Sequence, residues 1–254
     1  MRLILSFLVG GSYVAFTLWV SERFGSRIGG LLGGLPSTIL VSLVFIAWNQ
    51  GNEAVITALS IAPAVLAACT FFLIAFVNLH KYGRSLATGG GLLLWFCTSF
   101  ILVTIGPRNI FISTAIAVVF LGAAIVFLRR FPDGKVFKAS LTKGEFFFRV
   151  VFAGTIIALA VLASKLLGPL WGGMMAGFPA GFLPSMFILE RKHGIRFAAS
   201  VAKNMPYGNI AMIFFLLTLF FLIPVAGMVW ATLVAYLASL LCAFLINRYF
   251  LAKY

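Results

Sequence analysis

Charged side chains are scarce in this 254-residue sequence, at 9% of all residues, and acidic ones are the scarcest, with five Asp and Glu in total. Hydrophobic residues make up 63% of the chain, against roughly half in an ordinary soluble domain. No water-soluble fold of this length can hide so much apolar surface. The lack of charge therefore excludes a soluble globular domain and predicts a protein that lies in a lipid bilayer.

The residues that most enzymes and metal sites depend on are also few. The chain has two histidines and three cysteines, and it shows no serine-histidine-acid set, paired carboxylates, Walker loop or metal-ligand spacing. Cys69, Cys97 and Cys242 all fall inside apolar segments, where a free cysteine behaves as a small hydrophobe. We therefore expect no enzymatic activity, no cofactor and no bound metal.

The net charge of +14 is compatible with nucleic-acid binding, because basic clusters attract phosphate backbones. On a chain without a soluble domain, these charges instead report membrane orientation and contact with anionic headgroups. The partner that we expect is the lipid bilayer, and we expect no nucleic acid.

Apolar runs recur from one end of the chain to the other. A membrane span needs roughly 20 predominantly apolar residues, and in lipid its backbone must satisfy its own hydrogen bonds. The runs lack the alternating polarity of barrel strands, so the predicted fold is all-α, a polytopic transmembrane helix bundle. The nine predicted spans lie near residues 3–20, 28–48, 54–78, 86–105, 110–129, 146–164, 170–189, 204–223 and 226–247.

The distribution of Lys and Arg supports nine spans. Basic residues near span ends stay on the cytoplasmic side of the membrane. With nine spans, 16 of the 19 Lys and Arg fall on one face, and only Arg2, Arg108 and Lys165 fall on the other. We expect an extracytoplasmic N-terminus and a cytoplasmic C-terminus, in the plasma membrane of a prokaryote.

The sequence contains an internal duplication. A shift of 143 positions aligns glycines and prolines without a gap, including Gly29 with Gly172, Gly30 with Gly173, Gly34 with Gly177 and Pro36 with Pro179. We predict a first four-span repeat at 1–107, a linking span and loop at 108–145, and a second four-span repeat at 146–254. Five crossings separate equivalent spans, so the repeats run in opposite directions, an architecture common in secondary transporters.

Both repeats carry a Gly-Pro element near the middle of a span. Proline interrupts a helix, and the half-helix that begins there points its positive dipole end into the membrane centre. Matching broken spans in two halves point to a transporter site near the midplane. The predicted substrate-binding residues are Gly33, Gly34, Pro36, Ser37, Thr38, Gly177, Pro179 and Gly181.

A simpler interpretation of the same element is helix packing. Gly29/Gly33 and Gly173/Gly177 have the GxxxG spacing that lets membrane helices approach closely. Packing alone and packing combined with a solute site both stay open. Ser37 and Thr38 favour a site in the first half, because their equivalents Ala180 and Gly181 have no side chains that can form hydrogen bonds.

The remaining polar candidates lie near span ends. We interpret Glu190 and its basic neighbours as a solvated interfacial cluster, because charges at span ends usually serve as anchors. We expect Arg149 to extend back to the cytoplasmic interface and His80 to be solvated. The amphipathic segment 195–207 either lies along the interface or lines a cytoplasmic vestibule.

Both repeat elements resemble the GlpM-type family of small bacterial inner-membrane proteins, also described as a domain of unknown function. The resemblance is carried by GGLLGGLPSTILVSLVFI at 29–46 and GGMMAGFPAGFLPSMFILERKHG at 172–194. It covers about half of each repeat. The family's members have about half this length and about four spans, so the resemblance implies that this chain is a fused duplicate of such a unit. It implies no defined substrate.

Two functions follow from these patterns. The first is a transporter of a small polar or anionic solute, with its site where spans two and seven cross. The second is a non-transporting membrane scaffold or lipid-related accessory protein, which uses the Gly motifs for packing. A channel ranks lower, because no charged filter ring is present. The sequence leaves the oligomeric state open.

Overall fold

The computed structural model describes residues 1–33, 36–131 and 142–251, with residues 20–33 and 250–251 described by their backbone alone. Every element in these ranges is a helix, in agreement with the predicted all-α fold. The helices are α1 Arg2–Gly33, α2 Ser37–Gln50, α3 Asn52–Leu59, α4 Ala62–Leu79, η1 His80–Tyr82, α5 Arg84–Ile105, α6 Ile110–Leu128, α7 Lys143–Leu167, α8 Pro169–Ala176, α9 Phe182–His193, α10 Ile195–Ala202, α11 Met205–Ile246 and η2 Asn247–Leu251.

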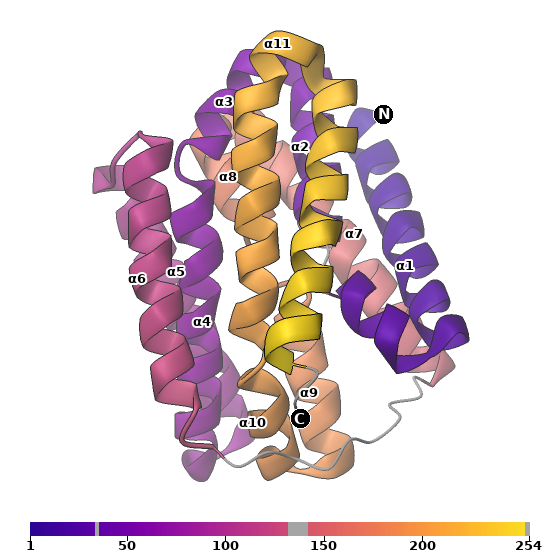
Figure 1. Cartoon of the computed structure of the whole chain (residues 1–254), viewed down its shortest axis with the longest axis vertical. Helices are drawn as coiled ribbons and strands as arrows, with labels where there is room; N and C mark the ends of the chain where they lie inside the picture. Colours follow the sequence, from indigo (N-terminus) through magenta and orange to yellow (C-terminus); the bar gives the residue numbers. More distant parts are fainter. Residues whose placement is uncertain (34–35, 132–141, 252–254) are drawn as a thin grey trace.

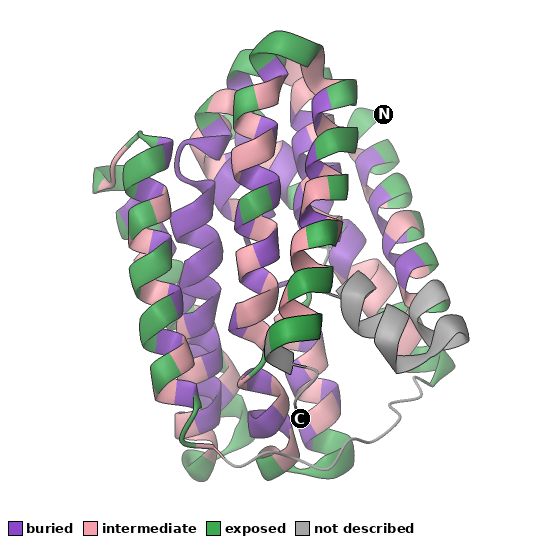
Figure 2. Ribbon diagram, in the orientation of Figure 1, coloured by how far each residue is buried: buried purple, intermediate pink, exposed green. Residues whose placement is uncertain are grey.

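The bundle has the surface of a membrane protein. Six helices in the described ranges are long and apolar enough to cross a bilayer, namely α1, α4, α5, α6, α7 and α11. Large apolar side chains such as Val119, Val225 and Trp230 stand more than half exposed on the outward faces of α6 and α11 (Figure 2). Exposure of so extensive an apolar surface to water is unfavourable, whereas lipid chains solvate it. The chain is an integral membrane protein.

Some helices of the two halves begin or end at equivalent residues. The bounds of α3, shifted by 143, are those of α10, and α4 and α11 begin at equivalent positions. Gly51 and Gly194, which precede α3 and α10, have nearly the same backbone angles, φ 85° and ψ 175° against φ 80° and ψ 169°. This positive φ is accessible to glycine and costly for other residues, which explains a glycine at both sites.

The chain reverses direction within α11. Helical geometry is interrupted at Gly227 (φ 70°, ψ 170°), and the ribbon turns back there to give two antiparallel arms (Figure 1). The first arm packs against α3 and α4, and α4 itself is buried along most of its length (Figure 2). α4 and the first arm of α11 therefore form the centre of the bundle, one from each half.

A reciprocal glycine contact joins the two halves at the crossing of α1 and α7. These helices lie side by side and run in opposite directions (Figure 1). Gly11 packs against Val150, and its equivalent Gly154 packs against Phe7, the equivalent of Val150. An added Cβ at Gly154 would lie 2.8 Å from the carbonyl oxygen of Phe7. The two contacts are related as in a two-fold interface, where each partner offers the same patch.

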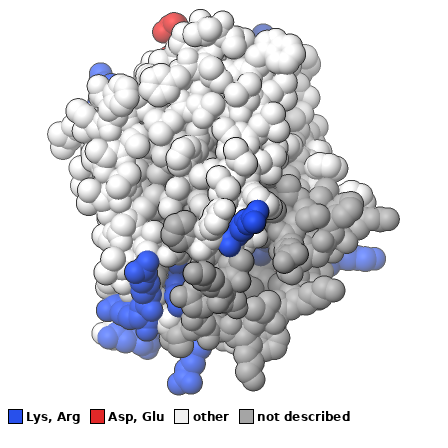
Figure 3. Space-filling model, in the orientation of Figure 1, with Lys and Arg blue, Asp and Glu red and all other residues white. Residues whose placement is uncertain are grey.

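Charged residues are concentrated at one end of the bundle. Lys and Arg gather at the lower end of the view in Figure 3, where η1, α6 and α9 end and α7 begins. α7 begins with a capping box: Thr142 Oγ1 accepts from the Glu145 amide, and the Thr142 amide donates to the Glu145 carboxylate. The rest of the predicted linking loop, residues 132–141, lies outside the described residues.

Candidate functional site

Both Gly-Pro elements interrupt their helices, and in each the proline precedes a new helix. In the second half, α8 ends at Ala176 and α9 begins at Phe182. The carbonyl of Pro179 accepts from the Leu183 amide at 2.9 Å, and the carbonyl of Pro36 accepts from the Leu40 amide at 2.8 Å. These two hydrogen bonds are equivalent in the repeats. Each proline thus supplies the first carbonyl of a half-helix and leaves the amides of the next residues without a helical partner.

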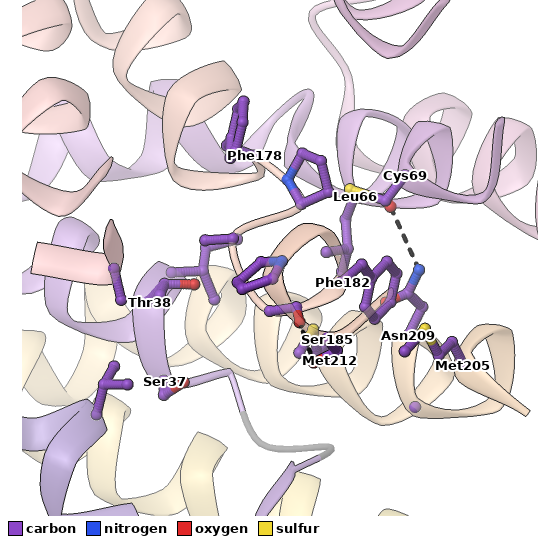
Figure 4. Close-up of a pocket in the computed structure, with 18 of the residues that line it drawn as sticks. Ser37, Thr38, Leu66, Cys69, Phe178, Phe182, Ser185, Met205, Asn209 and Met212 are labelled. Atoms are coloured by element: carbon purple, nitrogen blue, oxygen red, sulfur yellow. Dashed lines mark hydrogen bonds between the residues drawn. The ribbon is translucent and has the colours of Figure 1, made fainter. Parts of the chain in front are cut away.

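A cavity of about 440 Å³ lies where the two half-helices begin. Residues of α1, α2, α4, α7, α8, α9, α10 and α11 line it, together with the chain between α8 and α9 (Figure 4). Its volume is within the range of ordinary ligand pockets, roughly 300–1,000 Å³. Five pairs of equivalent residues face it from the two halves: Ser37 and Ala180, Thr38 and Gly181, Ile39 and Phe182, Leu66 and Asn209, and Cys69 and Met212.

The eight residues of the predicted site lie in different places. Those that line the cavity are Ser37, Thr38, Pro179 and Gly181. Gly177 instead packs against α4, because an added Cβ would lie 2.9 Å from Cγ1 of Val65. Pro36 is buried at the start of α2, outside the cavity lining. Gly33 is described by its backbone alone, and Gly34 lies outside the described residues.

Asn209 in α11 is a cavity residue that the sequence reasoning missed. It is fully buried, and its Nδ2 donates to the main-chain carbonyl of Leu66 at 3.4 Å (Figure 4). Since that carbonyl can only accept, the bond fixes the orientation of the amide. The other amide atom, Oδ1, is buried and has no hydrogen-bond partner among the described residues. The signal in the sequence is a polar residue near the start of a long apolar run.

The structure corrects the expectation for Arg149. This residue was expected to extend to the cytoplasmic interface, but it lines the cavity from α7. The reason is the rotation of α7 about its axis: Ala153, one turn further along the helix, faces the same cavity. Val14 and Leu18 of α1, in the other half, line the same cavity.

The charges around the cavity have one sign. Arg149 is the one charged residue among the described residues that line it, and no carboxylate is among them. The amino ends of α2 and α9 also meet here, and each carries a partial positive charge from its helix dipole. In the described ranges no group of three His, Cys, Asp or Glu is placed to hold a metal ion. Arg149 and the amino ends of α2 and α9 thus place positive charge at the described part of the lining.

The break between α8 and α9 is tied to the first half by a thiol. The Sγ of Cys69 in α4 donates to the carbonyl of Gly177 at 3.1 Å. Trp95 of α5 packs edge-on against Phe178, with 4.9 Å between ring centroids. These contacts hold the irregular segment of the second repeat against helices of the first.

Glu190 joins the two halves at the basic end of the bundle, which corrects the prediction of a solvated cluster. It is 7% exposed and lies 3.0 Å from His80 and 2.5 Å from Arg84, measured from carboxylate oxygen to nitrogen. Burial acts to raise the pKa of Glu190, but the bonds from Arg84 and His80 outweigh it and hold that pKa below its usual range. Glu190 is buried because the turn between α4 and α5 packs over the end of α9, which its place near a span end did not reveal.

An all-helical apolar bundle built from two equivalent halves around a shared cavity is an integral membrane protein with a duplicated domain. A family model matches the chain twice, at residues 3–108 and 146–252, and it describes a protein of unknown function, DUF3147. The chain belongs to this family, and each half is one copy of its domain. No curated protein and no solved structure matches the chain. The resemblance to the GlpM-type family stays a prediction.

Proposed function

We propose that this protein transports a small solute, with its binding site in the cavity between the repeats. The observation that carries the proposal is the lining of that cavity by five pairs of equivalent residues. A site shared by two equivalent halves can be opened to either side when one half rocks against the other. Helix breaks beside the cavity support the same function, because irregular backbone at membrane depth is tolerated where it is buried or lines a cavity.

The proposal includes nine crossings and repeats of inverted topology. The spans would be α1, α2 with the chain before it, α3 with α4, α5, α6, α7, α8 with α9, and the two arms of α11. The antiparallel directions of α1 and α7, with their reciprocal glycine contacts, support a two-fold axis in the membrane plane. The gathering of Lys and Arg at one end supports a cytoplasmic location for that end and an extracytoplasmic N-terminus.

A cavity-filling substitution tests the proposal. An added Cβ at Gly181 meets no atom within 4 Å, and Gly181 lines the cavity, so Gly181→Phe places a ring there without a backbone clash. Gly122 of α6 is exposed and equally free of contacts, which makes Gly122→Phe the matched control. The measurement is flux of small organic acids, amino acids and polyols into liposomes that contain the purified protein.

We expect protein-dependent flux of at least one of these solutes, its loss in Gly181→Phe and its retention in Gly122→Phe. Pro36→Ala and Pro179→Ala should each reduce the flux, because a continuous helix withdraws its amino end from the cavity. Unchanged flux in both proline variants and in Gly181→Phe would overturn the site assignment. Absence of flux for every solute would overturn the transport proposal.

The alternative function, a scaffold or lipid-related accessory protein, rests on the close packing of α8. An added Cβ at Gly173 would lie 2.8 Å from the carbonyl oxygen of Ala58 in α3. Close packing accounts for that glycine without any solute. A scaffold would keep its partner when the cavity is filled, so copurification of the same lipids or proteins with the wild type and with Gly181→Phe, in the absence of flux, would favour it.

A further inference from the structure

We propose that the entrance to this cavity lies at the basic end of the bundle, and that α10 with the first turn of α11 is the gate that closes it. This inference rests on the proposed function, because it describes how the same cavity would exchange its access between the two sides of the membrane. It depends on a comparison of the gate with its equivalent in the first half, which is α3 with the first turn of α4.

The cavity extends toward the end of the bundle where α10 lies. Figure 1 places α10 at the basic end, where Lys and Arg gather, and α3 at the opposite end. Three residues in or just after α10 line the cavity, and their equivalents in or just after α3 are not among its described lining residues: Val201 and Ala58, Asn204 and Ile61, and Met205 and Ala62. Segment 195–207 thus forms part of the cavity wall, which is one of the two placements expected for it.

The burial of these equivalent residues also differs between the two ends. Ala58, Ile61 and Ala62 are at most 1% exposed, whereas Asn204 is exposed and Met205 is partly exposed. A side chain loses its accessible area only when neighbouring atoms cover it. The space beside α3 is therefore filled by packed atoms, and the corresponding space beside α10 is not. Asparagine in place of isoleucine suits a position that contacts water.

Glycine contacts with α8 close the α3 end. An added Cβ at Gly173 would lie 2.8 Å from the carbonyl oxygen of Ala58, and one at Gly177 would lie 2.9 Å from Cγ1 of Val65. Glycines at this spacing let helices of a membrane protein approach closely. Since α8 belongs to the second half and α3 and α4 belong to the first, these contacts hold the two halves together at this end.

The duplication allows the two arrangements to be exchanged between the halves. Because both halves are copies of one domain, a packing that one half adopts is also available to the other. In a second state, α10 would pack as α3 does in this structure, and α3 would separate as α10 does. That state closes the basic end and opens the opposite end. Alternation between the two states exposes the cavity to one side of the membrane at a time.

The test is the rate at which a water-soluble, charged methanethiosulfonate modifies single cysteines in the purified full-length protein in detergent. Met205→Cys and Ala62→Cys form an equivalent pair in a background without Cys69, Cys97 and Cys242. We expect Met205→Cys to react at least about tenfold faster, because a minor second state, populated at about 10% or less, would expose Ala62→Cys only part of the time. Equal rates, or a faster reaction of Ala62→Cys, would overturn the inference.

Two controls show that the reagent reaches both ends of the bundle. Glu53→Cys in α3 and Arg196→Cys in α10 replace exposed residues at equivalent positions. These two cysteines should react at similar rates, so a slow reaction of Ala62→Cys would reflect the closed passage at its end. Thermal unfolding of each variant confirms that the compared proteins are folded.

A substitution at the closed end tests the exchange itself. Gly173→Ala places a methyl group against the carbonyl of Ala58 and should push α3 away from α8. We expect faster reaction of Ala62→Cys together with slower reaction of Met205→Cys, because the second state becomes more populated. Gly122→Ala, with no atom within 4 Å of the added Cβ, should change neither rate. A rise of both rates in Gly173→Ala would indicate a loosened fold and would overturn the exchange.

The modification rates need no solute, which separates this inference from the proposed function. Unequal rates that respond in opposite directions to Gly173→Ala, in a protein that shows no flux, would leave the gate standing and overturn transport. Flux in a protein whose equivalent cysteines react equally would do the reverse.

Discussion

The side-chain amide of Asn209 donates to the main-chain carbonyl of Leu66, and these two residues occupy the same position in the two repeats. In a two-fold arrangement, equivalent residues contact each other only near the axis. Under the proposed two-fold arrangement, the axis would pass close to this hydrogen bond, beside the cavity that both residues line. One residue of the pair is apolar and the other polar, so that axis would relate the backbones of the halves better than their side chains.

Replacement of Glu190 should destabilise the protein. Glu190→Gln removes the negative charge that Arg84 and His80 share across the two halves, and we expect a loss of about 1–3 kcal/mol, the range for hydrogen bonds to charged groups less the screening of the half-exposed Arg84. Thermal unfolding in detergent measures it. Glu53→Gln is the control, since Glu53 is exposed at the start of α3, and it should change stability far less. Equal effects of the two substitutions would show that the cluster at Glu190 does not stabilise the fold.

The stabilisation from Glu190 should depend on pH. The pKa of this carboxyl is lower in the folded protein than its ordinary value of 4.5, so its contribution is fully present above that value. It is lost as the pH falls through the folded pKa, because the carboxylate becomes protonated there. The difference in melting temperature between the wild type and Glu190→Gln should therefore be constant near neutral pH and shrink below about pH 4.5. A difference that grows on acidification would contradict this account.

The crossing of α1 and α7 should not tolerate a methyl group at its glycine. Gly154→Ala brings Cβ to 2.8 Å from the carbonyl oxygen of Phe7, and overpacking of this kind costs about 1–3 kcal/mol. Gly122→Ala, in the exposed part of α6 with no atom within 4 Å, should instead stabilise the helix by about 0.5–1 kcal/mol. Unfolding measurements on the two variants should thus shift in opposite directions. A neutral Gly154→Ala would show that the helices cross less closely than described.

Equivalent residues of the two repeats should be accessible from opposite sides of the membrane. Glu53 and Arg196 are exposed and lie 143 positions apart, which makes Glu53→Cys and Arg196→Cys a matched pair. In a background without Cys69, Cys97 and Cys242, an impermeant maleimide added to intact cells should label Glu53→Cys. It should label Arg196→Cys only after permeabilisation. Labelling of both variants from one side would exclude inverted topology.

Backbone features could be predicted from the sequence because glycine and proline determine backbone geometry locally. Pro36 and Pro179 predicted two helix interruptions, and α2 and α9 begin just after them. The 143-residue offset predicted the duplication. The family model, which matches the chain twice, and the equivalent helix bounds both agree with it. Hydropathy predicted membrane helices, and six helices in the described ranges are long and apolar enough to cross a bilayer. Nine crossings and their inverted arrangement stay predictions.

The side chains of the site could not be predicted so well, because their positions depend on how helices rotate and pack. Arg149 faces the cavity through the rotation of α7, and Asn209 meets Leu66 because two distant helices lie together at the centre. The burial of Glu190 depends on a turn that is about 110 residues away in the sequence. Contacts between residues that are far apart in the chain cannot be predicted from local patterns in a single sequence.

The position equivalent to Arg149 holds Ser6, just as the position equivalent to Asn209 holds Leu66. Two separate copies of one identical domain would form a pocket with the same groups on both sides, and a ligand could bind there in either of two equivalent poses. Fusion of the copies allows each half to carry its own side chains. A molecule bound between such halves would have one pose, and its two ends would contact different side chains.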